Sequence, residues 1–322
     1  MKRLKTSTKV IIFGSVFLIL LTVFFSFLNY NMHTYLDSGE EYKQNWYCKE
    51  YNFKCLLDRI IVNLSYRNEN QYNYPYCHAQ ASAHAFSTCT GISAKGMCCS
   101  ELYYFPETYV GNGKKVLVVP MTRKSYTTEV RMAIDKVRSY PGVKSLAITC
   151  DPDSSKYNDY MLLSPETPED SVIMTRSFTS MIYLAVVMSY YVGGKKEKIE
   201  QLKDYAANAE SFLKATDEMA KKIVAEHPEC NLFITLGQGI NYGIANECMN
   251  KMKEMSLSNS EAYYTLEYRH GPMSLVDDKT LIILLGNEDT VDGDAKLLTQ
   301  MKEYGAKVLA IGNNASKDFT DV

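Results

Sequence analysis

The sequence predicts an α/β protein with two tandem doubly wound parallel sheets, the second truncated, behind an N-terminal transmembrane helix. Three observations support this fold class. Short apolar strands alternate with helices in two separate stretches, a charged helical segment at 195–228 lies between them, and residues 10–28 carry no charge. With 322 residues, of which 46% are hydrophobic, the chain can bury about two cores.

The first alternation predicts a domain at 76–194. An alanine-rich helix opens it and ends at Gly91, because glycine most readily adopts the left-handed conformation that caps a helix. Strands and helices then follow one another in the order that is typical of a parallel sheet. The apolar runs place strands at 115–120, 144–149 and 160–163 and helices at 127–139 and 177–192.

The second alternation predicts a domain at 229–322. Gly193-Gly194 and Pro228 bound the helical linker that precedes it. No strand is readable after the last apolar run, so we expect this domain to be C-terminally incomplete. Residues 30–75 show weak periodicity, with only 55–62 suggesting a helix or strand, and are expected to form an irregular lead-in. Within the domain, strands are expected at 232–236, 262–267, 280–285 and 307–311, and helices at 240–255 and 295–304.

Residues 1–29 are expected to anchor the chain in a membrane as a single-pass segment. The run of 19 uncharged residues at 10–28 matches the bilayer's hydrocarbon core of roughly 30 Å, at about 1.5 Å per residue. A secretory signal is the alternative, although the run is longer than such signals usually are. Basic residues precede the run and acidic residues follow it, so the positive-inside rule places 30–322 on the far side.

Charge and cysteine content exclude several functions. A formal net charge of −2 provides no field to attract nucleic acid, so no nucleic-acid partner is expected. The nine cysteines show neither a C-x-x-C pair nor the spacing of a zinc site, and we interpret them as reduced thiols. No metal site and no cofactor are predicted.

A glycine turn and three charged residues mark the second domain as a candidate site. Gly237-Gln238-Gly239 follows a strand and opens a helix, where backbone amides can hold an anion, although many such turns are only tight turns. Lys251 and Glu254 lie three residues apart on that helix, and Glu247 lies four residues before Lys251. All three therefore share one face. A solvated ladder of salt bridges is the alternative interpretation.

One histidine and one polar loop add further candidates. His270 precedes Gly271-Pro272 at the expected end of a strand, where an imidazole can face a crevice, although a single histidine is more often structural. The loop at 121–129 joins a strand to a helix and combines hydroxyls, two cations and free amides. Such a loop fits a phosphate, and an N-capping cluster is the equally weighted alternative.

These segments resemble a known family. Residues 237–256 (G-Q-G-I-N-Y-G-I-A-N-E-C-M-N-K-M-K-E-M-S) and 260–277 (S-E-A-Y-Y-T-L-E-Y-R-H-G-P-M-S-L-V-D) match it in spacing and in residue type. The family is that of the sugar isomerase (SIS) domains, in particular the second SIS domain of the isomerase half of glutamine-fructose-6-phosphate aminotransferase and its glutaminase-free relatives. First-domain segments match as well, so the resemblance covers roughly residues 76–318, with matches at 91–92, 100–102, 122–129 and 171–181.

The resemblance implies a sugar-phosphate isomerase or an amino-sugar-phosphate deaminase. It implies that Glu254 shuttles a proton between C1 and C2 of the open sugar, that Lys251 lies near the carbonyl, and that His270 opens the ring. In the family this histidine comes from the neighbouring subunit, which implies a homodimer. Positions implied to hold the sugar phosphate are Thr122, Arg123, Lys124 and Thr127, and Val172 is implied to touch the sugar.

The chain departs from the family where the phosphate is held. The family's loop S-x-S-G-x-T is replaced at 122–127 by T-R-K-S-Y-T, which lacks the glycine that allows close backbone approach. Lys124 can compensate as a point charge. Asn73-Tyr74-Pro75 stands where the family has a glycine turn, and the sequence shows no apolar strand directly before it. A glutaminase domain is not expected.

The sequence leaves two hypotheses open. The first is a glutaminase-free SIS protein that binds a phosphorylated sugar or amino sugar and interconverts aldose and ketose forms, with or without exchange of an amine at C2. The second is a catalytically weak or inactive SIS module, either a membrane-tethered sensor or a gene fragment. Family precedent places the body in the cytoplasm, which conflicts with the orientation that the positive-inside rule predicts.

Overall fold

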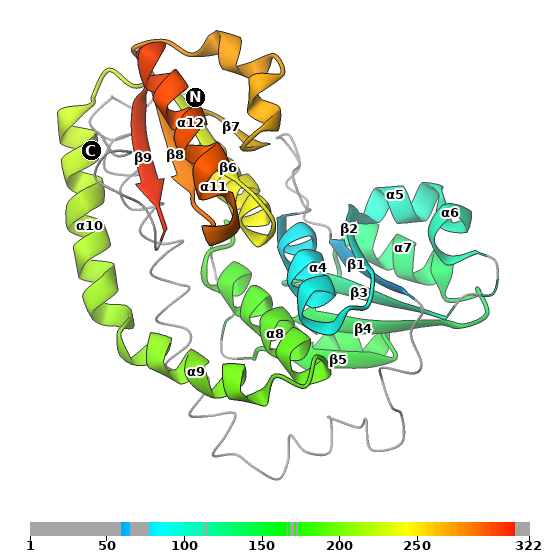
Figure 1. The fold of residues 1–322 in the computed structure, drawn as a ribbon. Helices are drawn as coiled ribbons and strands as arrows, with labels where there is room; N and C mark the ends of the chain where they lie inside the picture. The colour runs from blue at the N-terminus through cyan, green and yellow to red at the C-terminus, as the bar shows by residue number, and fades with distance from the viewer. Residues whose placement is uncertain are drawn as a thin grey trace. The chain divides into compact units, whose positions relative to one another are not determined.

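The computed structural model describes residues 59–64, 77–111, 113, 115–165, 167, 171 and 173–312. The described residues form two compact units that meet in the chain between Ser211 and Phe212. Each unit contains one sheet in which all strands are parallel (Figure 1). The α/β class and the parallel sheets predicted from the sequence are therefore confirmed.

The first unit is built on a five-stranded sheet with the order β2-β1-β3-β4-β5. Its central strand β3 is buried along its whole length, as expected for the apolar run V-L-V-V-P-M-T. The strands are β1 (Arg59–Leu64), β2 (Ala94–Cys98), β3 (Val116–Thr122), β4 (Val143–Thr149) and β5 (Tyr160–Leu163). The helices are α4 (Cys77–Thr90), α5 (Cys99–Tyr104), α6 (Pro106–Val110), α7 (Thr128–Val137), the 3-10 helix η1 (Pro152–Lys156), α8 (Arg176–Val192) and α9 (Lys196–Ala207).

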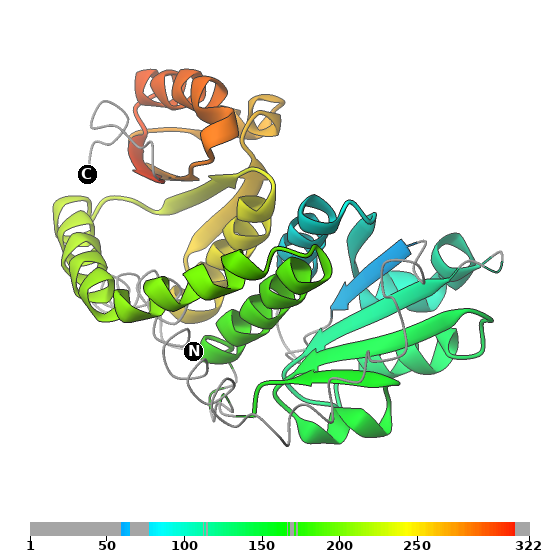
Figure 2. The ribbon, with the colours of Figure 1, turned by 60° about the horizontal axis from the view of Figure 1, so that its bottom comes forward.

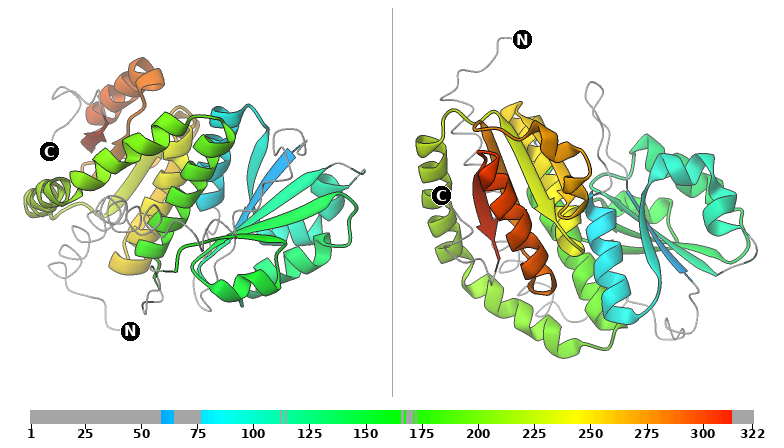
Figure 3. Two further views of the ribbon diagram at one scale, coloured as in Figure 1. Left: turned by 90° about the horizontal axis from the view of Figure 1, so that it is seen from below. Right: turned by 45° about the horizontal axis from the view of Figure 1, so that its top comes forward.

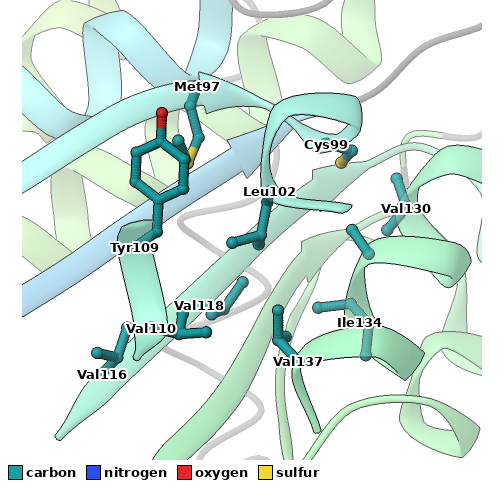
Figure 4. Close-up of a cluster of buried hydrophobic side chains, with 11 residues drawn as sticks. Met97, Cys99, Leu102, Tyr109, Val110, Val116, Val118, Val130, Ile134 and Val137 are labelled. Carbon is teal, nitrogen blue, oxygen red and sulfur yellow. The ribbon is translucent and has the colours of Figure 1, made fainter. Parts of the chain in front are cut away.

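Helices cover both faces of this sheet. Helices α4 and α8 lie side by side on one face (Figure 2). Their packing is close: a Cβ atom on Gly96 of β2 would lie 2.5 Å from the backbone of Ala79 in α4. On the other face, α5, α6 and α7 enclose an apolar cluster over β3 (Figure 4). Its members are Met97, Cys99, Leu102, Tyr109, Val110, Val116, Val118, Val130, Ala133, Ile134 and Val137.

The second unit has a four-stranded sheet with the order β7-β6-β8-β9, which repeats the order of β2-β1-β3-β4 in the first sheet. In both sheets the strand order reverses at one pair of neighbouring strands, β1 and β3 in the first sheet and β6 and β8 in the second. Ligands of open α/β sheets bind at such a reversal point. The unit contains α10 (Ala209–Glu226), β6 (Leu232–Gly237), α11 (Ile240–Ser256), β7 (Asn259–Tyr264), β8 (Thr280–Leu285), α12 (Val291–Glu303) and β9 (Lys307–Ile311). Short 3-10 helices lie at η2 (Glu267–Arg269), η3 (Pro272–Leu275) and η4 (Glu288–Thr290).

Alternate residues of β8 face opposite sides of this sheet. Leu281 and Ile283 pack with α10 and with Met252 of α11, whereas Ile282 and Leu284 pack with α12. This period of two is the signature of a strand buried on both faces. Figure 3 shows α12 lying along β8 and β9. The packing fixes α11, which carries the candidate site, on the face shared with α10.

Several element boundaries differ from the sequence expectation. The sequence left a helix or a strand open at 55–62 within the irregular lead-in, and the structure has strand β1 at Arg59–Leu64, which pairs with both β2 and β3. Strand β2 was not expected, because its sequence A-K-G-M-C contains a lysine and a glycine, which are depleted in strands. Helices α5 and α6 were not expected either. Strand β7 begins and ends three residues earlier than expected, and α12 begins four residues earlier.

The prediction of an N-terminal transmembrane helix is corrected. Within the described ranges, no helix combines the length and the apolar character needed to cross a membrane. The apolar helix α8 has 17 residues and is thus about 26 Å long, short of the roughly 30 Å hydrocarbon core, and it is buried against α4. The expected anchor at 10–28 lies outside the described residues, and the single-pass membrane localisation that rested on it is withdrawn with it.

Candidate functional site

The candidate site is built on helix α11, which begins directly after strand β6. Gly237 ends the strand, and a Cβ atom there would lie 2.6 Å from the backbone oxygen of Asn241, so only glycine fits. Gly239 has φ 59°, a conformation that glycine adopts without strain. Gln238 accepts the backbone N–H of Asn241 at 3.0 Å, which closes the turn. The two glycines therefore fix where α11 starts.

Three charged residues of α11 form one ion-pair cluster. The Nζ of Lys251 lies 3.0 Å from Oε1 of Glu247 and donates a hydrogen bond of 2.7 Å to Oε2 of Glu254. The helical spacings of four and three residues bring the two carboxylates to either side of the ammonium group. The structure thus joins Lys251 and Glu254, as the sequence predicted, and includes Glu247.

Burial separates the roles of these three residues. The side chains of Glu247 and Lys251 are each 3% exposed, whereas that of Glu254 is 14% exposed. The solvated salt-bridge ladder considered from the sequence is therefore wrong for this cluster. Because it is the most exposed of the three, Glu254 is the residue of the cluster that a ligand can reach.

The cluster controls the charge of its members and of a neighbouring thiol. Burial alone would lower the pKa of Lys251, but the two carboxylates raise it well above its usual range, so the ammonium form persists at neutral pH. Burial, together with the charge of Glu247, raises the pKa of the Cys248 thiol to about 12. Cys248 is therefore an inert packing residue.

An aromatic stack borders the same helix. The rings of Tyr242, in the first turns of α11, and Tyr264, at the end of β7, are stacked with centroids 3.6 Å apart. Ring stacking of this kind adds roughly 0.5–1.5 kcal/mol to simple burial. The stack ties the carboxyl end of β7 to α11, and the sequence analysis did not identify it.

His270 lies in the 3-10 segment that follows β7. It caps η2 and donates its backbone N–H to the carbonyl of Glu267 at 3.0 Å. Strand β7 ends at Tyr264, so the expected position of His270 at a strand end is wrong. The imidazole is exposed, and among the described residues no hydrogen bond or ion pair joins it to Lys251 or Glu254.

The loop expected to hold phosphate connects β3 to α7 and makes hydrogen bonds within itself. The hydroxyl oxygens of Thr122 and Thr127 lie 3.1 Å apart, and each lies within hydrogen-bond distance of the Lys124 carbonyl, at 2.9 and 3.1 Å. Arg123 donates through Nη1 to the carbonyl of Ser171 at 2.6 Å. The four predicted residues are thus brought together in one loop. Val172 lies outside the described residues.

A carboxylate that no local sequence pattern indicated belongs to this loop. Both the backbone N–H and the hydroxyl of Ser125 donate to Oδ2 of Asp151, at 2.8 and 2.7 Å. Asp151 follows β4, and Thr149 of β4 is in register with Thr122 of β3. Because the carboxyl ends of parallel strands meet at one edge, the spacing of these residues from their strands could have revealed the pair.

No metal centre is apparent in the part of the chain that the structure describes. Among those residues, no group of three or more His, Cys, Asp or Glu side chains is arranged to hold a metal ion.

Comparison with known proteins finds a family match for part of the chain. Residues 229–319 match the model of the SIS domain. A glutamine–fructose-6-phosphate aminotransferase of Clostridium tetani is 28% identical over 219 residues, which cover 64% of this chain and 36% of that protein. A fructosamine deglycase of Bacillus subtilis is 29% identical over 235 residues, covering 69% of this chain and 70% of that protein. The chain thus spans about a third of the length of the aminotransferases that it matches.

Solved structures share the fold at low identity. The glucosamine-6-phosphate deaminase of Thermotoga maritima superposes with a TM-score of 0.63 at 23% identity, over 90% of this chain and 86% of that one. The tagatose-6-phosphate ketose/aldose isomerase of Escherichia coli gives 0.63 at 20% identity, over 98% of this chain and 82% of that one. The family resemblance seen in the sequence is confirmed: residues 229–319 match the SIS-domain model, and the similar proteins include sugar-phosphate enzymes.

Proposed function

We propose that this chain binds a phosphorylated sugar or amino sugar and interconverts its aldose and ketose forms at Glu254. The observation that supports the proposal is the Glu247–Lys251–Glu254 cluster, which lies within the residues matched by the SIS domain. Glu247 and Lys251 are buried, and the Lys251 ammonium group fixes the carboxylate of Glu254, which is the most exposed of the three. A fixed carboxylate beside a permanent ammonium group suits the transfer of a proton next to a carbonyl.

The proposed reaction moves one proton between adjacent carbons. Glu254 removes a proton from the carbon beside the carbonyl, and the electron pair of that C–H bond becomes the double bond of an enediol as the carbonyl oxygen gains a proton from solvent. The protonated Glu254 then returns its proton to the former carbonyl carbon, and the other hydroxyl releases its proton to solvent as it becomes the new carbonyl. Lys251, at 2.7 Å from Glu254, orients the carboxylate and supplies positive charge beside it.

The remaining predicted residues take supporting roles in this proposal. Thr122, Arg123, Lys124 and Thr127 would form a phosphate-binding loop within the first unit, because their loop leads into the N-terminus of α7. Gly237 and Gly239 would contribute by forming the turn that sets the start of α11. This role does not require an anion to bind at the turn. Isomerisation, deamination and deglycation share the same proton transfer, so the relatives' names favour the class of reaction and not one substrate.

The proposal is tested with the full chain and a panel of sugar phosphates. We expect ligand-induced rises in melting temperature with fructose 6-phosphate, glucosamine 6-phosphate or galactosamine 6-phosphate, and turnover of at least one of them. Glu254→Gln should lower turnover by about 10²–10⁴-fold and retain the thermal shift, and the exposed Glu218→Gln in α10 is the matched control. Flat thermal shifts across the panel would refute sugar-phosphate binding, and full turnover by Glu254→Gln would refute the assignment of the base.

We also propose that the chain acts as a homodimer in which His270 serves the site of the neighbouring subunit. His270 is exposed, and the apolar residues Leu266 and Leu275 beside it are 46% and 68% exposed, as expected of a surface that a partner covers. Random mixing of inactive Glu254→Gln and His270→Asn chains should then restore about a quarter of wild-type turnover, since half of the dimers would hold one intact site. No recovery on mixing would show that His270 serves its own subunit.

A second candidate function is a sugar-phosphate-binding module without turnover. The hydrogen bonds that the 122–127 loop makes within itself and with Asp151 favour it, because a weakly anchored phosphate would not supply the binding energy that positions the sugar for turnover. Thermal shifts in the absence of any turnover across the panel would select this function.

A further inference from the structure

The loop that joins β3 to α7 already holds an anion of its own chain. Ser125 donates its backbone N–H at 2.8 Å and its hydroxyl at 2.7 Å to the same oxygen, Oδ2 of Asp151. Ser125 is 8% exposed, so these donors have little access to solvent. A backbone amide and a hydroxyl converging on one oxygen are the donors with which such loops hold a phosphate.

The carboxylate of Asp151 is fixed and ionised. Its other oxygen accepts the backbone N–H of Asp153 at 3.0 Å, so the carboxylate also caps the 3-10 helix η1. Burial would raise the pKa of Asp151, but the hydrogen bonds from Ser125 and Asp153 and the charge of Lys156 lower it below its usual value. In the described part of the chain, no lysine or arginine lies within ion-pair distance of it. Its negative charge is therefore not cancelled by a direct partner.

A second pair in the same unit has the same chemistry in a different place. The backbone N–H and hydroxyl of Ser145 donate to Oδ2 of Asp159 at 2.8 and 3.1 Å. Asp159 directly precedes β5, at the amino ends of the parallel strands and thus at the sheet edge opposite the 122–127 loop. It also pairs with Lys144 at 2.9 Å, so its charge is balanced. The two pairs differ in position and in charge balance.

We propose that Asp151 is a specificity-determining residue that weakens the binding of dianionic phosphate at the 122–127 loop. It occupies the two Ser125 donors and adds a negative charge at the edge where a phosphate would lie. A sugar phosphate would therefore bind this loop more weakly than it would without the carboxylate, and its singly charged form would be weakened less than the dianion. The inference rests on the proposed function only in taking this loop as the part of the chain that faces the ligand.

The test compares two amide substitutions in the full chain. Asp151→Asn keeps an oxygen that can accept both Ser125 hydrogen bonds and removes the charge. Inorganic phosphate, titrated calorimetrically, should bind at least about tenfold more tightly to Asp151→Asn than to the wild type, since each unit of phosphate charge about 6 Å from the removed charge contributes about that factor at an effective dielectric constant of about 40. Asp159→Asn should leave phosphate affinity unchanged, because its charge lies at the opposite edge.

A second variant guards against loss of folding. Ser125→Gly removes one of the two hydrogen bonds to Asp151 and restores the glycine of the family pattern, so it should raise phosphate affinity by a smaller factor. Melting temperatures identify variants that have not folded. The inference is overturned if Asp151→Asn binds phosphate no more tightly than the wild type, if Asp159→Asn shows the same gain, or if no folded variant binds phosphate. The two proposals can fail separately. If the wild type turns over a sugar phosphate but Asp151→Asn binds phosphate no more tightly, the proposed function stands and only this inference is refuted.

Discussion

The ammonium nitrogen of Lys251 lies 3.0 Å from a carboxylate oxygen of Glu247, and both side chains are 3% exposed. A buried charge is strongly destabilising without a partner, because it has left water and gained no compensating interaction. Glu254 completes the set on the other side of the ammonium group at 2.7 Å. The stability of α11 and the position of the proposed base therefore depend on the same three residues.

Lys251→Met should destabilise the protein by about 3–5 kcal/mol, because it leaves two partly or fully buried carboxylates without their cation. Lys253→Met is the matched control: Lys253 is two positions away, 29% exposed and 3.5 Å from Glu261, so its loss should cost about 1 kcal/mol or less. Urea unfolding followed by circular dichroism measures both. Equal losses in the two variants would contradict the special status of the buried cluster.

Glu254→Gln and Glu247→Gln should separate chemistry from stability. Replacing Glu254 should lower turnover on a responsive sugar phosphate by about 10²–10⁴-fold, because the amide cannot accept a proton, with a small change in melting temperature. Replacing Glu247 removes the fully buried partner of Lys251 and should mainly lower the melting temperature. Steady-state kinetics and thermal melting, run on both variants, report the two effects, and the reverse pattern would exclude Glu254 as the base.

Gly237→Ala should destabilise the second unit by about 1–3 kcal/mol. The added Cβ would lie 2.6 Å from the backbone oxygen of Asn241, which cannot move without shifting the start of α11. Gly293→Ala in α12 is the control, since its Cβ would meet only a side-chain carbon of Leu266 at 3.5 Å. That change should be neutral or stabilising by up to about 1 kcal/mol, because alanine favours helix. Thermal unfolding decides the matter, and a Gly237→Ala protein as stable as Gly293→Ala would show that the turn tolerates a side chain.

Asp294→Asn should stabilise the protein more at neutral than at acid pH. Asp294 is 4% exposed and accepts the Thr290 hydroxyl at 2.6 Å, and burial raises its pKa above the usual value. The native state thus binds this proton more tightly than the unfolded state, so the contribution of Asp294 to stability falls as pH rises from the unfolded value, about 3.9, through the raised native value. Asparagine keeps the acceptor and removes the penalty.

The measurement for Asp294 is the free energy of unfolding of wild type and variant at several pH values between about 3.5 and 7. The difference between them should grow with pH. Asp292→Asn, an exposed change in the same first turn of α12, should show no such growth. A difference for Asp294→Asn that is constant across this range would mean that its pKa is unperturbed.

The sequence by itself determined the fold class and most elements of both sheets. Apolar runs such as T-L-I-I-L-L at 280–285 predicted strands correctly, because a strand buried on both faces is continuously apolar. The spacing of Lys251 and Glu254 placed them on one helical face without any tertiary information. Strand β2 escaped prediction because its polar residues obtain their place from pairing with β1, which no local pattern reveals.

Tertiary structure decided what local sequence leaves open. The spacing of Glu247, Lys251 and Glu254 suits a solvated ladder of salt bridges as well as a buried cluster. Only the packing of α11 on its sheet excluded water from Glu247 and Lys251. Asp151 meets Ser125 from 26 residues away because β3 and β4 are parallel neighbours whose carboxyl ends lie together. Periodicity therefore fixed which residues share a helix or strand, and the register of the sheets fixed which charges meet and which lose their water.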